Sequence, residues 1–155
     1  MFNSNTVAVE PARSIIVDLD FTLNAFRKQK VYTDSEAYGR MSKRLLFMRK
    51  GDFISDPNMG IGLSSYRFRD LDHLLAGSLR DEILNQHNTY IKGIVTTDVV
   101  LSKTKYQNDF ILFIDIIAQS PVVEKITHAF VQRDSAIVKS QLKIEKPRVI
   151  NPYEE

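Results

Sequence analysis

The sequence predicts an α+β protein in which two main helices pack on a small, mainly antiparallel sheet, with flexible arms at both ends. Residues 33–51 and 70–90 repeat apolar side chains at the three- and four-residue spacing of amphipathic helices. Residues 94–119 and 137–146 carry the alternating or continuous apolar patterns of strands. Because one early strand and two helices precede this run of strands, the order favours segregated α+β over alternating βαβ units.

The bulk composition fits one soluble domain. The chain has 155 residues, and we expect one domain over residues 13–146, between a loose arm at residues 1–12 and a disordered tail at residues 147–155. The net charge of +2 supplies no strong attraction to nucleic acid or to an anionic membrane. Absence of cysteine excludes disulfides, thiolate zinc sites and a cysteine nucleophile. With no long apolar run and no signal peptide, the protein is expected to be made and assembled in the cytoplasm.

The first strand is predicted over residues 14–21, where apolar residues occupy alternate positions and two aspartates fall on the other face. A polar stretch, residues 24–32, follows it. A helix then begins at a cap formed by Thr33, Asp34 or Ser35, and it ends at Gly51. Its apolar stripe consists of Ala37, Met41, Leu45 and Met48.

A loop and a second helix come next. Residues 51–63 (GDFISDPNMGIGL) contain a proline and three glycines, which marks a loop with a defined backbone path. The second helix is predicted over residues 70–90. Gly77 in its middle costs about 1 kcal/mol relative to alanine, and the sequence alone does not decide whether a glycine there serves close packing. The inner side of this helix is predicted to carry Leu71, Leu75, Leu79, Ile83 and Tyr90.

The rest of the chain is predicted to be mainly strands. Residues 94–102 and 110–119 form a hairpin across a turn at residues 105–109. The stretch 110–117 (FILFIDII) is apolar on both faces, as expected of a central strand that is covered on both sides. Residues 123–130 fit either a short helix or another strand. Residues 137–146 alternate again, with a lysine-lined face that is typical of an exposed edge strand.

Candidate catalytic and metal-binding groups are few. His73, His87 and His128 are scattered without metal-site spacing, so we interpret them as solvated or packed side chains. Asp52 and Asp56 flank a loop, but a calcium loop needs many more oxygen ligands in order. Four carboxylates that a glycosidase could use lie on predicted helix surfaces: Glu36, Asp72, Asp81 and Glu82. No serine-nucleophile elbow is present. We therefore predict no catalytic residues, no metal and no cofactor.

Two further motifs have ordinary explanations. The Gly60-Ile61-Gly62 turn is similar to a phosphate-binding turn but lacks the third glycine and the preceding strand. The stretch 66–69 (YRFR) interleaves arginines with aromatics, as single-strand nucleic-acid binders do. One such stretch more often has packed aromatics, with arginines that face water or a protein partner.

The long stretch 37–68 (AYGRMSKRLLFMRKGDFISDPNMGIGLSSYRF) resembles the signature of sheath initiators, a phage-tail baseplate wedge family that includes a small type VI secretion baseplate component. Its pattern is a helix with an apolar end, a basic-Gly turn, a proline, and an apolar residue before glycine. Those places are taken by Leu45, Leu46, Arg49, Gly51, Pro57, Met59 and Gly60. Residues 18–21 (DLDF) match the family's usual opening, and the resemblance extends over residues 18–119. The family's Glu-Pro-Arg motif is replaced by residues 90–94 (YIKGI), a difference that bears on the wedge contact.

The resemblance implies a structural, non-enzymatic subunit in the tail baseplate of a virion, assembled in the host cytoplasm. Its implied partners are baseplate wedge proteins on the helical side and the first ring of sheath subunits, with the tail tube or hub as further candidates. No nucleic acid, membrane or small-molecule substrate is expected. Candidate partner-binding residues are Gly51, Pro57, Gly60, Gly62, Arg67 and Arg69.

The strand at residues 137–146, with Val138, Leu142 and Ile144, is the hypothesised sheath contact, as donor or acceptor in strand addition. The alternative is an internal strand of the domain's own sheet. Two other functions stay open. Members of the family have been labelled lysozyme-like, so one is a peptidoglycan-hydrolysing tail component. The other is the equivalent subunit of a type VI secretion baseplate.

Overall fold

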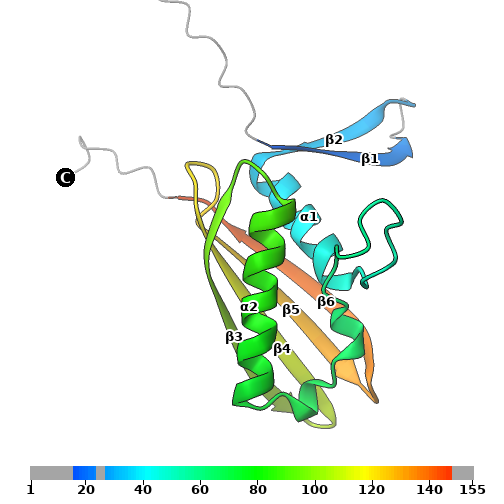
Figure 1. Ribbon diagram of the computed structural model, residues 1–155, viewed down its shortest axis with the longest axis vertical. Coiled ribbons are helices and arrows are strands. Elements are labelled where there is room, and N and C mark those ends of the chain that lie inside the picture. Colours follow the sequence, from blue (N-terminus) through cyan, green and yellow to red (C-terminus); the bar gives the residue numbers. More distant parts are fainter. Residues whose placement is uncertain (1–15, 24–26, 148–155) are drawn as a thin grey trace, which may run out of the picture.

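The computed structural model describes residues 16–23 and 27–147. It confirms the α+β class: both helices lie on one face of a four-stranded sheet, and a two-stranded ribbon stands beside them (Figure 1). The helices are α1 (Asp34–Phe47) and α2 (His73–Tyr90), with short 3-10 turns η1 (Leu63–Ser65) and η2 (Phe68–Asp70) between them. The strands are β1 (Val17–Leu23), β2 (Gln29–Thr33), β3 (Val95–Tyr106), β4 (Asp109–Gln119), β5 (Lys125–Arg133) and β6 (Ala136–Glu145).

The main sheet is an antiparallel meander in the order β3-β4-β5-β6. The predicted hairpin is confirmed, with longer strands and a turn of two residues at Gln107 and Asn108. The undecided stretch 123–130 lies mainly in β5. Alternate side chains of β4 and β5 are buried, as the period of two requires of a strand with one face on a core.

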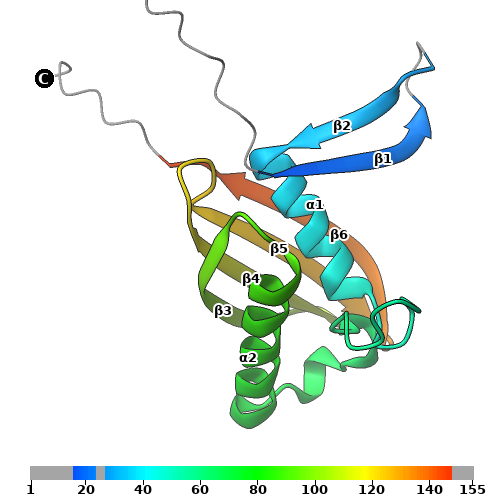
Figure 2. The same ribbon diagram turned by 45° about the horizontal axis from the view of Figure 1, so that its top comes forward.

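The prediction that β4 is covered on both faces is wrong for the described part of the chain. Figures 1 and 2 place α1 and α2 on the same side of the sheet. Leu112, Ile114 and Ile116 face the helices and are at most 1% exposed. Ile111 and Phe113, on the opposite face, are half-buried. The strand is apolar on both faces although the described elements pack on only one of them.

The core lies between the two helices and the inner face of the sheet. Leu79 and Ile83 of α2 are fully buried there, as predicted. Leu75 is 39% exposed, so its predicted place on the inner side is wrong. The buried face of α2 also includes Gln86 and His87. These two polar side chains can be buried because each has a hydrogen-bond partner in the interior. A prediction of the buried face from the spacing of apolar residues cannot include these two positions, because it counts only apolar side chains.

The chain before α1 forms a ribbon that the sequence only half predicts. Strand β1 is confirmed, but the polar stretch at residues 24–32 contains most of a second strand, β2, paired antiparallel with β1. Figures 1 and 2 show the ribbon projecting from the start of α1. Burial on β1 is the reverse of the polarity pattern: Val17 is 50% exposed and Asp18 only 7%. Two arginines of α1 form ion pairs with the Asp18 carboxylate, and these offset the free-energy cost of burying its charge.

The ends of α1 differ from the prediction by a few residues. Thr33 occupies the N-cap position in extended conformation, but its side chain makes no capping bond. The helix ends at Phe47, four positions before Gly51, because Met48 turns to extended backbone. The N-cap of α2, by contrast, is satisfied: the Asp72 carboxylate accepts a hydrogen bond from the Leu75 N–H at 2.8 Å. The predicted N-terminal arm and almost all of the predicted C-terminal tail lie outside the described residues.

Candidate functional site

The loop after α1 contains four of the predicted partner-binding residues, and the structure gives two of them an internal role. The Ile61 N–H donates to the Leu45 carbonyl at 3.0 Å, and the Gly62 N–H donates to the Met48 carbonyl at 2.8 Å. These bonds satisfy carbonyls that the end of a helix leaves open. Both Gly60 and Gly62 have positive φ, which favours glycine. The two glycines therefore let the loop lie against α1, and both are buried.

A glutamine of α2 holds the other side of this loop. The Gln86 amide accepts from the Gly60 N–H at 3.0 Å and donates to the Asn58 carbonyl at 2.9 Å. Inside the loop, the Gly51 N–H donates to the Pro57 carbonyl at 2.9 Å. The tip between these anchors presents apolar side chains to solvent, with Phe53 47% and Ile54 94% exposed. A tip of this kind on an anchored loop is suited to contact a protein partner.

Arg67 and Arg69, the other predicted contact residues, lie together elsewhere. Both line a polar cavity of about 350 Å³ with Asn108, Phe110, Gln132, Asp134 and Ser135. The backbone on both sides of Arg67 is held by buried Gln132, which accepts from the Phe68 N–H at 2.7 Å and donates to the Tyr66 carbonyl at 2.8 Å. The aromatic Phe68 is fully buried and both arginines are exposed, as the packed-aromatic interpretation predicts.

The hypothesised sheath-contact strand is β6, an edge of the main sheet. It pairs with β5 along its length, and its other edge is unpaired among the described residues. In the structure β6 is therefore a strand of the domain's own sheet, which is the alternative given above. Leu142 and Ile144 face α1, where they approach Gly39. Val138 falls at an irregularity in the register and is 53% exposed.

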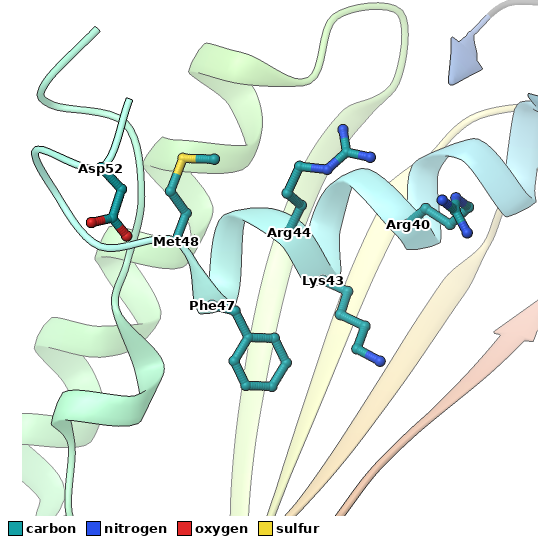
Figure 3. A pocket seen from close by; sticks show the side chains of 6 residues that line it. All are labelled: Arg40, Lys43, Arg44, Phe47, Met48 and Asp52. Atoms are coloured by element: carbon teal, nitrogen blue, oxygen red, sulfur yellow. The ribbon is translucent and has the colours of Figure 1, made fainter. Parts of the chain in front are cut away.

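A surface hollow with a volume of about 540 Å³ runs along α1. Figure 3 shows its lining residues: Arg40, Lys43, Arg44, Phe47, Met48 and Asp52. In this view Lys43 and Phe47 leave one side of the helix and Arg44 leaves the other. Arg40 and Arg44 each lie 3.2 Å from the Asp18 carboxylate. The groove therefore joins a basic stretch of helix to an apolar end.

A buried polar cluster, which the scattered histidines did not predict, ties three elements together. Ser42 of α1 lies 2.7 Å from His87 of α2 and 2.9 Å from His128 of β5, measured from its hydroxyl oxygen to each Nε2. The His87 Nδ1 lies 2.8 Å from the Ile83 carbonyl and donates to it, so its Nε2 accepts from Ser42. Ser42 then accepts from the His128 Nε2–H. The His128 Nδ1 has no hydrogen-bond partner among the described residues.

Both rings of this cluster are neutral at ordinary pH. Burial lowers the pKa of His87 to about 4. Burial, with the charges of His87 and Lys43, lowers the pKa of His128 to about 3. Ser42 and both histidines are fully buried, so no substrate reaches the serine hydroxyl without opening the core. The cluster is suited to holding the helices on the sheet.

The carboxylates considered for sugar hydrolysis are dispersed. Glu82 pairs with Lys50 at 2.7 Å, and Asp72 caps α2. Within residues 16–23 and 27–147, no group of three or more acidic, histidine or cysteine side chains could hold a metal ion. No described helix has the length and apolar character needed to cross a membrane. The chain matches no family model, no curated protein and no solved structure.

Proposed function

We propose that this chain is a structural subunit of a contractile-tail baseplate, located in the virion, that starts polymerisation of the sheath. The observation that carries the proposal is β6, an edge strand of 10 residues whose outer backbone is unpaired among the described residues. The resemblance of residues 18–119 to sheath initiators suggests that such an edge would be used in the baseplate of a contractile tail. The order of strand, helix, glycine-rich loop, helix and hairpin supports the same assignment.

An exposed strand edge joins two proteins efficiently. Its main-chain N–H and C=O groups give affinity to any added strand, and alternate side chains set the register. Lys139 and Lys143 on the outer face discourage chance pairing with other edges. Strand β6 is suited to accept a strand, not to be donated, because it is paired along its length with β5. The Glu124 N–H also donates to the Glu145 carbonyl at 2.9 Å, next to the end of β5.

The wedge contact would lie on the helical side. Where the family has its Glu-Pro-Arg motif, this chain buries Ile91 and Ile94, each only 2% exposed, and turns at Gly93 with φ of 94°. That position serves the protein's own core here. The exposed loop tip with Phe53 and Ile54 and the groove along α1 are then the surfaces open to wedge proteins.

Single proline substitutions in β6 test the role of its edge without removing the strand. The N–H groups of Ser140 and Gln141 point to opposite edges, because neighbouring residues of a strand alternate. One of S140P and Q141P therefore breaks a bond to β5 and lowers the melting temperature. The other removes a donor from the free edge alone and leaves stability nearly unchanged.

Each variant is expressed in cells that lack the wild-type gene, and particles are viewed by electron microscopy. The stable variant is expected to give baseplates and tubes without sheath. If the stable variant assembles normal contractile tails, the β6 edge is not the site of sheath initiation.

A further inference from the structure

The outer face of β6, which points away from the helices, carries more positive than negative charge. Lys139, Lys143 and Glu145 all lie on this face, at alternate positions of the strand. Two lysines share the Glu145 carboxylate, which lies 3.4 Å from the Lys143 Nζ and 3.9 Å from the Lys125 Nζ of β5. Lys139 is exposed and has no ion pair within the described part of the chain. One lysine of β6 is therefore uncompensated, and the other shares its carboxylate.

The remaining carboxylates on this face of β4 are already engaged. Asp109 forms two hydrogen bonds of 2.9 Å with the Arg133 guanidinium. The Asp115 carboxylate accepts a hydrogen bond from the Thr127 hydroxyl at 2.7 Å. Both aspartates stand on β4, which β5 separates from β6. An acidic side chain beside Lys139 would therefore have to come from a strand added to the edge.

The inner face of β6 is apolar at the same edge. Leu142 has α1 directly over it, because a β-carbon on Gly39 would stand 2.9 Å from the Leu142 Cδ2. On β5 its neighbour is His128, which is fully buried. Leu142 nevertheless remains 37% exposed. Since the helix and β5 cover its other sides, the exposed surface lies where the next strand would pack.

The opposite edge of the sheet is partly closed by α2. The Asn88 amide accepts from the Thr96 N–H at 2.9 Å and donates to the Thr96 carbonyl at 2.9 Å. Next along β3, the Arg80 Nε donates to the Val99 carbonyl at 2.8 Å. Side chains of the protein itself therefore use backbone groups that an added strand would need at β3. This leaves β6 as the edge at which the choice of partner is made.

A second copy of the chain is a poor partner for β6. Two copies of β6 that paired antiparallel about Gln141 would place Lys139 of each copy beside Lys143 of the other. Parallel pairing in register would place each lysine beside its own counterpart. Like charges directly opposite one another destabilise a strand pair. The lysines therefore disfavour self-pairing and favour a strand with the opposite charge.

We infer that the strand accepted by β6 alternates acidic and apolar side chains, with acidic residues beside Lys139 and Lys143 and an apolar residue beside Leu142. Such a strand supplies the carboxylate that Lys139 lacks and covers the exposed surface of Leu142. The inference rests on the proposed function, because it names the chemistry of the strand that the same edge accepts. In the proposed baseplate this strand belongs to a sheath subunit.

A set of three peptides tests the inference. The probe is a synthetic peptide of four Glu-Val repeats. It is compared with a peptide of four Lys-Val repeats, and with a peptide of the same composition as the probe in which Glu-Glu-Val-Val repeats destroy the alternation. Each peptide is titrated into isotope-labelled full-length protein and followed by NMR. The Glu-Val peptide is expected to shift the amide signals of residues 139–145, with an affinity that falls as salt rises.

The two comparison peptides are expected to bind about fivefold or more weakly than the probe. The Lys-Val peptide places like charges beside the lysines of β6, and the reordered peptide cannot keep acidic and apolar side chains on separate faces. Equal binding of the three peptides would overturn the inference. So would the absence of shifts in residues 139–145 with the Glu-Val peptide at millimolar concentration.

Two charge reversals supply the matched comparison. Lys139→Glu should lower the preference for the Glu-Val over the Lys-Val peptide about fivefold or more. Lys92→Glu makes the same change at an exposed position just before β3, the opposite edge of the sheet, and should leave the preference unaltered. An equal change in both variants would show that the net charge of the protein, and not the β6 edge, selects the peptide.

The outcome separates from that of the proline experiment. Sheathless particles with the stable β6 variant, together with equal binding of the peptides, would leave the proposed function standing and remove the charge selectivity. Normal sheath with that variant, together with selective binding of the Glu-Val peptide at β6, would leave the selectivity and remove sheath initiation at this edge.

Discussion

Gly60 lies so close to Met48 that a β-carbon on it would stand 2.4 Å from the Met48 carbonyl oxygen. The φ of Gly60 is +117°, a conformation that side chains rarely adopt. Gly60→Ala is therefore expected to lower the free energy of unfolding by about 3 kcal/mol or more. Relief of the clash would require the Met48 carbonyl and the end of α1 to shift, which would disturb the packing around them. Chemical denaturation measures the loss.

Two other glycines are the controls. Gly51→Ala meets nothing within 4 Å, so only the strain of its positive φ remains, about 1 to 2 kcal/mol. Gly77→Ala, in the middle of α2 with open space around it, should stabilise the protein by about 1 kcal/mol. Equal effects at Gly60 and Gly51 would show that the contact with Met48 contributes nothing.

Gln86 is expected to be essential for holding the loop onto α2. Gln86→Leu removes the acceptor of the Gly60 N–H and the donor to the Asn58 carbonyl, and it leaves a buried N–H unsatisfied. We expect a loss of about 2 to 4 kcal/mol and faster hydrogen exchange at residues 58–62. The neighbouring Asn85→Leu, at an exposed position, should change stability by less than about 0.5 kcal/mol. A loop with unchanged exchange in the Gln86 variant would contradict this account.

Acid should weaken the fold before ordinary carboxylate titration begins. The unfolded chain binds protons at His87 and His128 near the usual histidine pKa of about 6.5, whereas the folded chain does so only near pH 4 and pH 3. Both folded pKa values are lowered, so the unfolded state binds more protons between these limits and stability falls as pH falls. The expected slope is about 2 to 3 kcal/mol per pH unit below pH 6. Denaturant titrations at several pH values measure it.

Replacing one ring isolates the effect. His128→Leu keeps the hydrogen bond between Ser42 and His87 and removes one titrating group, so the slope should fall to about half. His73→Leu, at the exposed start of α2, serves as the control and should retain the full slope. Stability that stays constant between pH 7 and pH 5.5 in the unsubstituted protein would show that the two rings bind protons equally in the folded and the unfolded chain, and it would contradict this account.

The elements that follow simple periodicity could be predicted from the sequence. Strands β3, β4 and β6 and the helix α2 have clear apolar patterns, so their existence and order agree with the structure. The positions that periodicity missed are those where a polar group is buried. Asp18 is buried because two arginines from α1 reach it, and β2 is a strand because β1 pairs with it. Neither cause is visible within a local window of sequence.

The candidate site was predictable to a similar degree. The glycine-rich loop was recognised, but its glycines hold the loop internally and the exposed tip residues Phe53 and Ile54 were not singled out. The convergence of His87 and His128 on Ser42 joins residues up to 86 positions apart, so spacing rules cannot find it. The i, i+3, i+4 spacing of cations at Arg40, Lys43 and Arg44 was the one available signal for the groove.

Purified protein is expected to leave peptidoglycan intact. Hydrolysis needs two carboxylates that flank one bond at about 5 to 9.5 Å from each other, with one of them protonated. Glu82 is bound to Lys50 and Asp72 to the start of α2, so neither is available for that task. A cell-wall turbidity assay, with lysozyme as the positive control, measures the activity. If the protein lowers the turbidity of the cell-wall suspension and Glu82→Gln abolishes that activity, the hydrolase function is favoured over the structural one.

The most direct test of the central claim is electron microscopy of particles produced without this gene. A sheath initiator is needed only after the baseplate and tube exist, so the account predicts tails with baseplate and tube but no sheath, restored by the wild-type gene in trans. Normal contractile tails in its absence would contradict the proposed function.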